Sequence, residues 1–158
     1  MVRNVSIPNA ETCSFSGATV LDINTRIPKL ISDRPHISTV IIHIGINDIK
    51  FKQSEVLKKH YLTLLSTVTA TGKTCIVSGP FPSPRHSDIQ FSRIRDLHVW
   101  LKGHCTASGL TYTDNFTTYW TQPDLFMRDG LHPNLAGARL LSANMELAME
   151  CLNWQHEA

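Results

Sequence analysis

Apolar and polar positions along the chain follow two different periods, and their alternation predicts strands separated by helices. The β-branched apolar run STVIIHI at 38–44 is bounded by turn-forming residues and predicts a strand buried on both faces. The apolar runs at 74–78 and 110–114 predict two further strands. Each is short and lies between residues that favour turns, which is typical of buried strands in a parallel sheet.

Three longer segments carry apolar residues at helical spacing. They predict helices that begin at Ser54, at Ser87 and after Asn134, all residues of the kind that caps helix N-termini. Gly72 and Gly109 follow the first two of these segments, as expected beyond a helix C-terminus. The third segment closes the chain after a long loop.

Signals near the N-terminus are weaker. The segment TCSFSG at 12–17 predicts a short edge strand, and the apolar positions from Val20 to Ile31 predict a helix. Pro28 must either kink that helix or lie in its first turn. Alternating strands and helices indicate βαβ crossovers, and therefore a parallel sheet covered on both faces in one domain over 1–158. In such sheets, ligands bind beyond the carboxyl ends of the strands.

Composition narrows the class of protein. The net charge is only +2 and the largest basic run is a lysine pair, so nucleic-acid binding through this domain alone is not expected. The four cysteines are widely spaced, which favours buried thiols in a reducing compartment over a disulfide framework or a zinc site. The sequence lacks a secretion-signal pattern and a long apolar run, so we expect a cytoplasmic protein.

Two short motifs follow predicted strands. GIND at 45–48 comes directly after the strand 38–44, where Asn47 can project its amide N–H groups into the crevice. DGLH at 129–132 precedes the last helix, and Gly130 lets the Asp129 carboxylate accept the Nδ1–H of His132, leaving Nε2 as a general base. Each motif alone also fits an ordinary turn, with His132 as a surface residue.

Taken together and in this order, the motifs resemble those of the SGNH (GDSL-type) hydrolases, a family of esterases and lipases. GIND is similar to the family's Asn block, DGLH to its Asp-x-x-His block and SFSGATVLDI to its Gly block. The resemblance implies a three-layer α/β/α sandwich with a flavodoxin-like parallel sheet. It also implies that His132 is the base, that Asp129 orients it, and that Gly17 N–H and the Asn47 side chain form the oxyanion hole. Neither a metal nor an organic cofactor is implied.

The sequence departs from the family at the nucleophile. The family's first strand ends in Gly-Asp-Ser, and no such tripeptide occurs in residues 1–158. Ser6, Ser14, Ser16 and Cys13 are the nearest alternatives, but none lies at a predicted strand-to-helix turn. We therefore expect that the natural protein continues upstream of residue 1 and that this segment supplies the first strand and the serine. The alternative is that the nucleophile position is modified or omitted from this sequence.

One branch of the family is especially similar. Four segments of the sequence resemble the esterase domains in first-open-reading-frame proteins of LINE-type (non-LTR) retrotransposons. They are VRNVSIPNAETCSFSGATVLDINTRIPKLI, IIHIGINDIKF, SGPFPSPR and RDGLHPNLAGARLLSANM. That resemblance implies an ester or lipid substrate, peripheral association with a membrane, and a coiled-coil or nucleic-acid-binding segment elsewhere in the protein.

Three hypotheses about the function of this protein remain open. The first is a serine esterase, with Trp120 in the aromatic segment 115–127 lining an acyl pocket; that segment also fits a small satellite core. The second is a catalytically inactive SGNH-like module that binds lipid or a partner, which the missing Gly-Asp-Ser favours. The third, a nucleotide-binding flavodoxin-like domain, lacks a glycine-rich phosphate loop. A hydrolase and an acyltransferase have the same sequence pattern here.

Overall fold

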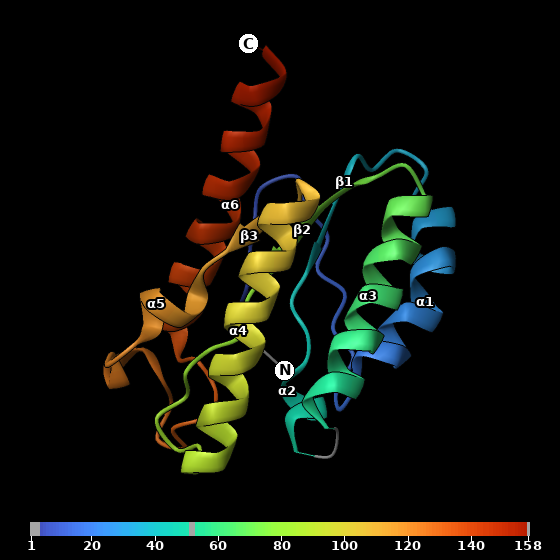
Figure 1. Cartoon of the computed structure of the whole chain (residues 1–158). Coiled ribbons are helices and arrows are strands. Elements are labelled where there is room, and N and C mark those ends of the chain that lie inside the picture. Colours follow the sequence, from blue (N-terminus) through green and yellow to red (C-terminus); the bar gives the residue numbers. More distant parts are fainter. Residues whose placement is uncertain (1–3, 51–52, 158) are drawn as a thin grey trace.

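The centre of the structure is a parallel sheet. The computed structural model describes residues 4–50 and 53–157. In that part of the chain, the strands β1 (Thr39–Ile42), β2 (Thr74–Ser78) and β3 (Thr111–Thr113) pair in parallel in the order β1-β2-β3. All of their carboxyl ends therefore point to one end of the molecule, the lower end in Figure 1.

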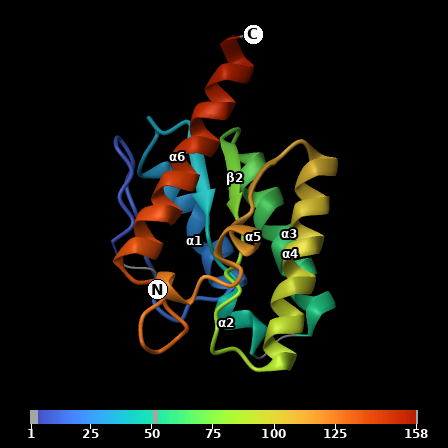
Figure 2. The ribbon, with the colours of Figure 1, turned by 90° about the vertical axis from the view of Figure 1, so that its left-hand side faces the viewer.

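Helices cover both faces of this sheet (Figures 1 and 2). One face packs against α1, α3 and α4, which share a core with Ile42 and Val77. The other packs against α6 around Phe81 and Tyr119. The predicted three-layer α/β/α sandwich is confirmed. The helices are α1 (Val20–Ser32), α2 (Ile46–Ile49), α3 (Ser54–Ala70), α4 (Asp88–Ser108), α5 (Asn115–Tyr119), the 3₁₀ turn η1 (Pro123–Leu125) and α6 (Leu135–Glu157).

Capping residues define most helix ends. Ser87 caps α4 through the N–H of Gln90, whose side chain accepts from the Ser87 N–H in return. Gly109 ends the helix in the left-handed conformation, at φ 69°. Asn134 caps α6 through the N–H of Gly137 at 2.9 Å, and α1 begins at a capping box on Thr19. The predicted caps Ser87 and Asn134 are confirmed.

Three local predictions are wrong. The segment 12–17 forms irregular chain and one turn rather than an edge strand, because no described strand lies beside it to pair with. Ser54 is the first residue of α3, and Gln53 takes the cap position without a side-chain hydrogen bond. In β1 only Ile42 is buried and the other residues are half-buried, because β1 lies at the edge of the described sheet.

Two of the four cysteines are buried and two are exposed. Cys75 and Cys105 are buried, as predicted, and burial raises the pKa of both thiols. The expectation of burial is wrong for Cys13 and Cys151, which are exposed. Over the described residues, each helix is too short or too polar to cross a membrane.

Candidate active site

Four loops converge at the carboxyl end of the sheet. The segment 43–48 follows β1, the segment 79–87 follows β2, and the segment 120–134 connects α5 to α6 (Figure 2). The fourth loop, 13–19, leads into α1. All the candidate catalytic and oxyanion residues predicted from the sequence lie on these loops, at the end where parallel sheets bind ligands.

Asp129 and His132 contact each other directly. His132 Nδ1 lies 2.5 Å from Asp129 Oδ2, while the other carboxylate oxygen accepts the N–H groups of Leu131 and His132 at 2.9 and 3.0 Å. This pairing favours the tautomer with its proton on Nδ1, so that Nε2 can accept a proton. The side chains of His132 and Asp129 are 51% and 39% exposed, which leaves the imidazole accessible.

The hydrogen bonds of Asp129 also control its ionisation. The pKa of the Asp129 carboxyl is well below its usual range, first because His132 donates to it and then because two backbone N–H groups do so. The carboxylate therefore stays ionised throughout the neutral range. A permanent negative charge at this position orients the imidazole and stabilises the imidazolium form when Nε2 takes a proton.

The loop that carries this pair is braced on both sides. The N–H of Met127 donates to the His132 carbonyl at 2.7 Å, which closes the turn, and Gly130 adopts φ 66° at its tip. Arg85 from the loop after β2 donates its N–H to the Gly130 carbonyl at 3.1 Å. A Cβ at Gly130 would lie 2.9 Å from the Arg85 Cβ, so this close approach requires glycine.

Helix α6 anchors the same loop from its other end. Gly137, in the first turn of α6, lies so close to η1 that a Cβ there would come within 2.2 Å of the Leu125 carbonyl oxygen. Tyr119 from α5 donates its hydroxyl to the Gly137 carbonyl at 2.5 Å, and the Asn134 N–H donates to the Leu125 carbonyl. The first turn of α6 and the His132 loop therefore form one packed unit.

Gly17 lies on the loop before α1 and Asn47 lies in the short helix α2, and these two segments are bonded together. Asn47 Nδ2 donates to the carbonyl of Ala18, the residue after Gly17, at 2.9 Å. Asp48 Oδ2 accepts the N–H of Val20 at 3.0 Å and ties the same segments a second time. The Gly17 N–H donates to no backbone carbonyl among the described residues, and the Asn47 amide carries a second N–H. Both groups can therefore donate to a ligand.

The structure joins the predicted site residues into two pairs. Asp129 contacts His132, and Asn47 contacts the residue next to Gly17. Within the described ranges, no hydrogen bond or ring contact links one pair directly to the other. Their catalytic and oxyanion roles stay predictions, because geometry alone does not test them. In the same part of the chain, no group of three His, Cys, Asp or Glu side chains has the arrangement of a metal site.

A buried polar cluster behind these loops was not expected from the sequence. Ser78 Oγ lies 3.0 Å from His43 Nδ1 and accepts an N–H of Asn115 at 2.8 Å. Although it resembles a Ser–His catalytic pair, Ser78 is only 1% exposed, and Phe81 lies against the His43 ring at 4.9 Å. A substrate cannot reach this oxygen, so the cluster is structural.

We expect His43 to make folding depend on pH. Burial lowers the pKa of His43 to about 4, although its contact with Ser78 opposes the shift. Below about pH 6.5 the unfolded chain binds a proton there that the folded chain refuses, so the free energy of unfolding falls as the pH drops, by on the order of 2 kcal/mol at about pH 4.5. In urea unfolding measured across this pH range, the free energy of unfolding of His43→Asn should change less with pH than that of the unsubstituted chain. The assignment would be contradicted if the pH dependence of the free energy of unfolding were the same in His43→Asn as in the unsubstituted chain. It would also be contradicted if the control His36→Asn, at an exposed residue, reduced that pH dependence equally.

Trp120 lies apart from the two pairs. It is 47% exposed and lines a hollow between α4 and α5 together with Phe91, Arg95, Phe116 and Thr117. None of the candidate catalytic or oxyanion residues lines that hollow. Contact between Trp120 and the acyl group of a substrate stays a prediction.

Comparisons with known proteins give the family. The model of the GDSL-like lipase/acylhydrolase family matches residues 3–140. The esterase domain of the ORF1 protein from the zebrafish ZfL2-1 retrotransposon is 39% identical, with a TM-score of 0.60 over 94% of this chain and 92% of that chain. None of the curated proteins compared with the chain matches it.

Two bacterial structures extend the likeness of fold. A GDSL-like lipase from Bacteroides thetaiotaomicron has a TM-score of 0.77 at 16% identity, over 87% of this chain and 73% of that chain. The psychrotrophic esterase EstA from Pseudoalteromonas has a TM-score of 0.62 at 18% identity, over 89% of this chain and 75% of that chain. Fold, sequence motifs and family model agree, and the chain belongs to the GDSL-like lipase/acylhydrolase family.

Proposed function

We propose that this protein is a serine esterase that hydrolyses small acyl or lipid-type esters. The observation that carries the proposal is the Asp129–His132 contact at 2.5 Å, which leaves Nε2 of an exposed imidazole able to accept a proton. An imidazole oriented by a carboxylate in this way is the general base of a hydrolytic triad. Family membership supports the same chemistry.

In the proposed reaction, a serine Oγ attacks the ester carbonyl carbon and passes its proton to His132 Nε2. The new C–O bond forms as the carbonyl oxygen becomes an oxyanion, and collapse of this intermediate expels the alcohol, which takes the proton from His132. Water then attacks the acyl carbon and passes a proton to His132. When the second intermediate collapses, the bond to serine breaks, the serine Oγ takes that proton back from His132, and the carboxylic acid leaves. Asp129 stays ionised throughout.

Gly17 and Asn47 are proposed to stabilise the oxyanion. The Gly17 N–H and the second N–H of Asn47 both lack a backbone acceptor among the described residues, and the bond from Asn47 to Ala18 holds the two loops together. Donors that are already oriented before charge develops cost little reorganisation, which is why such donors accelerate the chemical step.

We propose that residues preceding residue 1 supply the nucleophilic serine. Support comes from the edge of the sheet: β1 pairs with β2 on one side, and none of the described strands pairs with its other side. Three of the four β1 residues are only half-buried. An additional strand along this edge would satisfy the free backbone groups of β1 and would end beside Gly45, at the end of the sheet where His132 lies.

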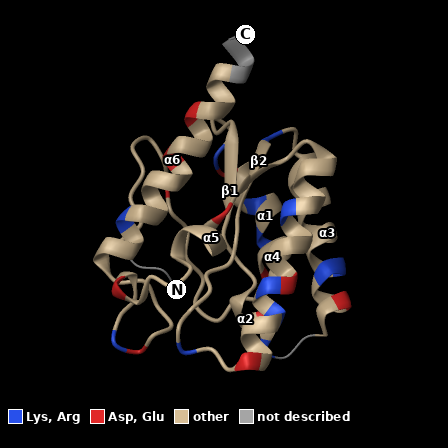
Figure 3. Ribbon diagram, turned by 60° about the vertical axis from the view of Figure 1, so that its left-hand side comes forward, with Lys and Arg blue, Asp and Glu red and all other residues tan. Residues whose placement is uncertain are grey.

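The setting of the reaction is proposed from the sequence resemblance to esterase domains of retrotransposon proteins, and the relative in the zebrafish retrotransposon supports that resemblance. We propose that this domain acts in the cytoplasm, in peripheral contact with a membrane, and is joined to a coiled-coil or nucleic-acid-binding segment. Nucleic-acid binding by the domain itself is not proposed. In the view of Figure 3, Lys and Arg are dispersed among Asp and Glu, which does not favour a continuous basic face.

Covalent labelling of the serine tests the proposal. Two proteins are compared, one that begins at residue 1 and one that includes the natural upstream residues; each is treated with a fluorophosphonate and assayed with p-nitrophenyl acetate. We expect hydrolysis only in the longer protein, and mass spectrometry should place the label on a serine upstream of residue 1. A folded longer protein without label or activity would instead support the catalytically inactive lipid- or partner-binding module.

A further inference from the structure

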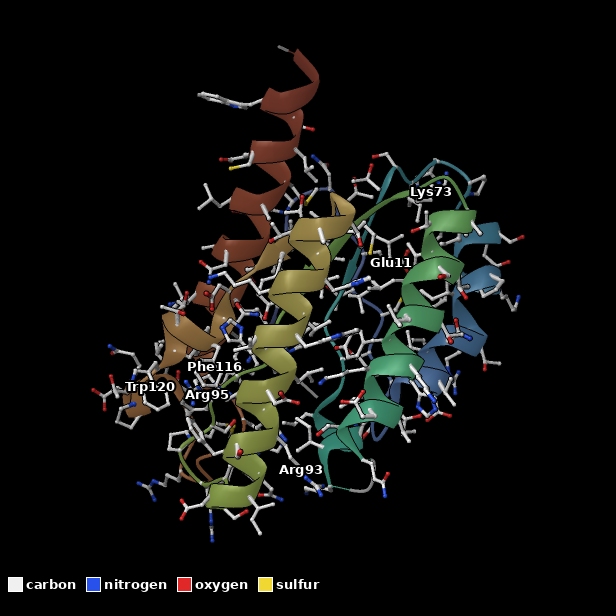
Figure 4. All side chains as sticks on the ribbon, viewed as in Figure 1. Glu11, Lys73, Arg93, Arg95, Phe116 and Trp120 are labelled. Atoms are coloured by element: carbon white, nitrogen blue, oxygen red, sulfur yellow. The ribbon has the colours of Figure 1, made fainter. Side chains whose placement is uncertain are left out.

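A hollow of about 440 Å³ opens on the outer side of α4 and α5. Phe91 and Arg95 line it from α4, while Phe116, Thr117 and Trp120 line it from α5 and the residue that follows. In Figure 4, Arg95, Phe116 and Trp120 lie together on this side of α4. Its volume is within the range of small-molecule sites, about 300–1,000 Å³.

Aromatic rings form the floor of this hollow. Phe91 and Phe116 lie 5.1 and 5.6 Å from Trp120 between ring centroids, and the planes of Phe116 and Trp120 differ by only 21°. On α4, the spacing of four residues from Phe91 to Arg95 directs both side chains to the same opening. Trp120, the residue that follows α5, brings its ring against Phe116 and Phe91. The rings provide a continuous apolar surface that water covers in the free protein.

The floor is held in place from behind. The ring of His98 stacks on Phe116 at 4.8 Å with an angle of 9° between the planes, and His98 Nδ1 lies 2.8 Å from the hydroxyl of Tyr112. Burial keeps the pKa of His98 below its ordinary value, so the ring stays neutral at pH 7. A surface fixed before binding loses little conformational entropy when a ligand arrives.

Arg95 gives the hollow a positive charge. Over the described residues its guanidinium forms no ion pair, and the nearby carboxylates already have partners. Asp96 lies 3.4 Å from Lys58, and Asp114 lies 3.3 Å from Lys102 and accepts both the N–H and the hydroxyl of Thr117. The charge on Arg95 is therefore available to a ligand.

We propose that this hollow binds a monocarboxylate on an apolar chain or ring, with the carboxylate on Arg95 and the apolar part on Phe91, Phe116 and Trp120. Guanidinium and carboxylate match in geometry and form strong charge-assisted hydrogen bonds. Arg95 repels cationic ligands. Among the residues that the structure describes, Arg95 is the one cation that lines the hollow, which favours a single negative charge over the dianionic phosphate of a nucleotide. The proposal does not depend on the esterase reaction, because Asp129 and His132 lie outside the hollow.

Fluorescence of Trp120 tests this proposal in the natural chain. The protein has three tryptophans, so the substitutions Trp100→Phe and Trp154→Phe leave Trp120 as the one reporter in residues 1–158. Titration with octanoate should give a saturable change in Trp120 emission, and calorimetry on the unsubstituted protein should return the same Kd. Octylamine should give no saturable change, and 1-octanol should bind about tenfold more weakly than octanoate.

The substitution Arg95→Gln separates charge recognition from apolar contact. It should weaken octanoate binding by about tenfold and leave 1-octanol binding unchanged. Arg139→Gln, which removes an exposed arginine on α6, should change neither. Thermal unfolding checks that each variant is folded, and unchanged octanoate binding in His132→Ala would separate this site from the proposed catalytic one. Equal affinity for octanoate and octanol, tighter binding of adenosine monophosphate than of octanoate, or no effect of Arg95→Gln would overturn the proposal.

Discussion

Replacing His132 by alanine is expected to lower kcat/KM for p-nitrophenyl acetate by about 10³–10⁴ in the natural chain, because the serine loses its general base. Asp129→Asn should have a similar effect. Its amide would offer an N–H rather than an oxygen to His132 Nδ1 and would favour the tautomer that has no acceptor at Nε2. Steady-state kinetics on purified variants measures both losses.

The matched control is His36→Ala, which removes another exposed imidazole far along the chain and should leave kcat/KM unchanged. The side chain of His132 is half exposed, so its removal should change the thermal unfolding midpoint very little. Activity that persists in a folded His132→Ala protein would mean that another base acts, and the proposed triad would be wrong.

Asn47→Ala is expected to reduce kcat by about 10²–10³ with little change in KM, because an oxyanion donor acts mainly in the transition state. The amide also holds the Ala18 carbonyl, so part of the effect would be structural. The split between kcat and KM distinguishes the two, since a loop that is merely displaced would alter both parameters.

Asp48→Asn serves as the control for loosening the same two loops. It weakens the bond to the Val20 N–H at 3.0 Å but keeps the Asn47 amide in place. We expect this variant to be less stable to urea, with kcat reduced much less than in Asn47→Ala. Equal losses of kcat in the two variants would show that Asn47 acts through loop structure and not on the oxyanion.

The sequence predicted those strands and helices whose ends are marked by local turn residues or helix caps. The strand at 74–78 follows a glycine turn and precedes Gly79 and Pro80, and its bounds match the prediction. Ser87 and Gly109 likewise bound α4, because caps are local hydrogen bonds and local backbone conformations. The short segment 12–17 failed the same kind of prediction, since a strand exists only if a partner lies beside it.

In the candidate site, too, contacts between residues close in sequence were predictable, whereas contacts that depend on tertiary structure were not. Asp129 and His132 are three residues apart, so their contact follows from one turn and was predicted from its residues. The pairing of the Gly17 and Asn47 loops rests on tertiary structure and was expected only from the family resemblance. The bond between His43, the residue after β1, and Ser78 at the end of β2 joins residues 35 positions apart. It depends on how the two strands align, and no periodicity in the sequence predicts it.

The first turn of α6 has a consequence for how heat inactivates the protein. His132 lies just before a helix terminus, and termini fray at lower free energy than the interior of a fold. The packing of Gly137 against Leu125 and the cap at Asn134 oppose that fraying, so the free energy that keeps the imidazole on its carboxylate is that of one helical turn. We therefore expect heating to abolish activity when this turn opens and releases the His132 loop, before the sheet and its larger core unfold.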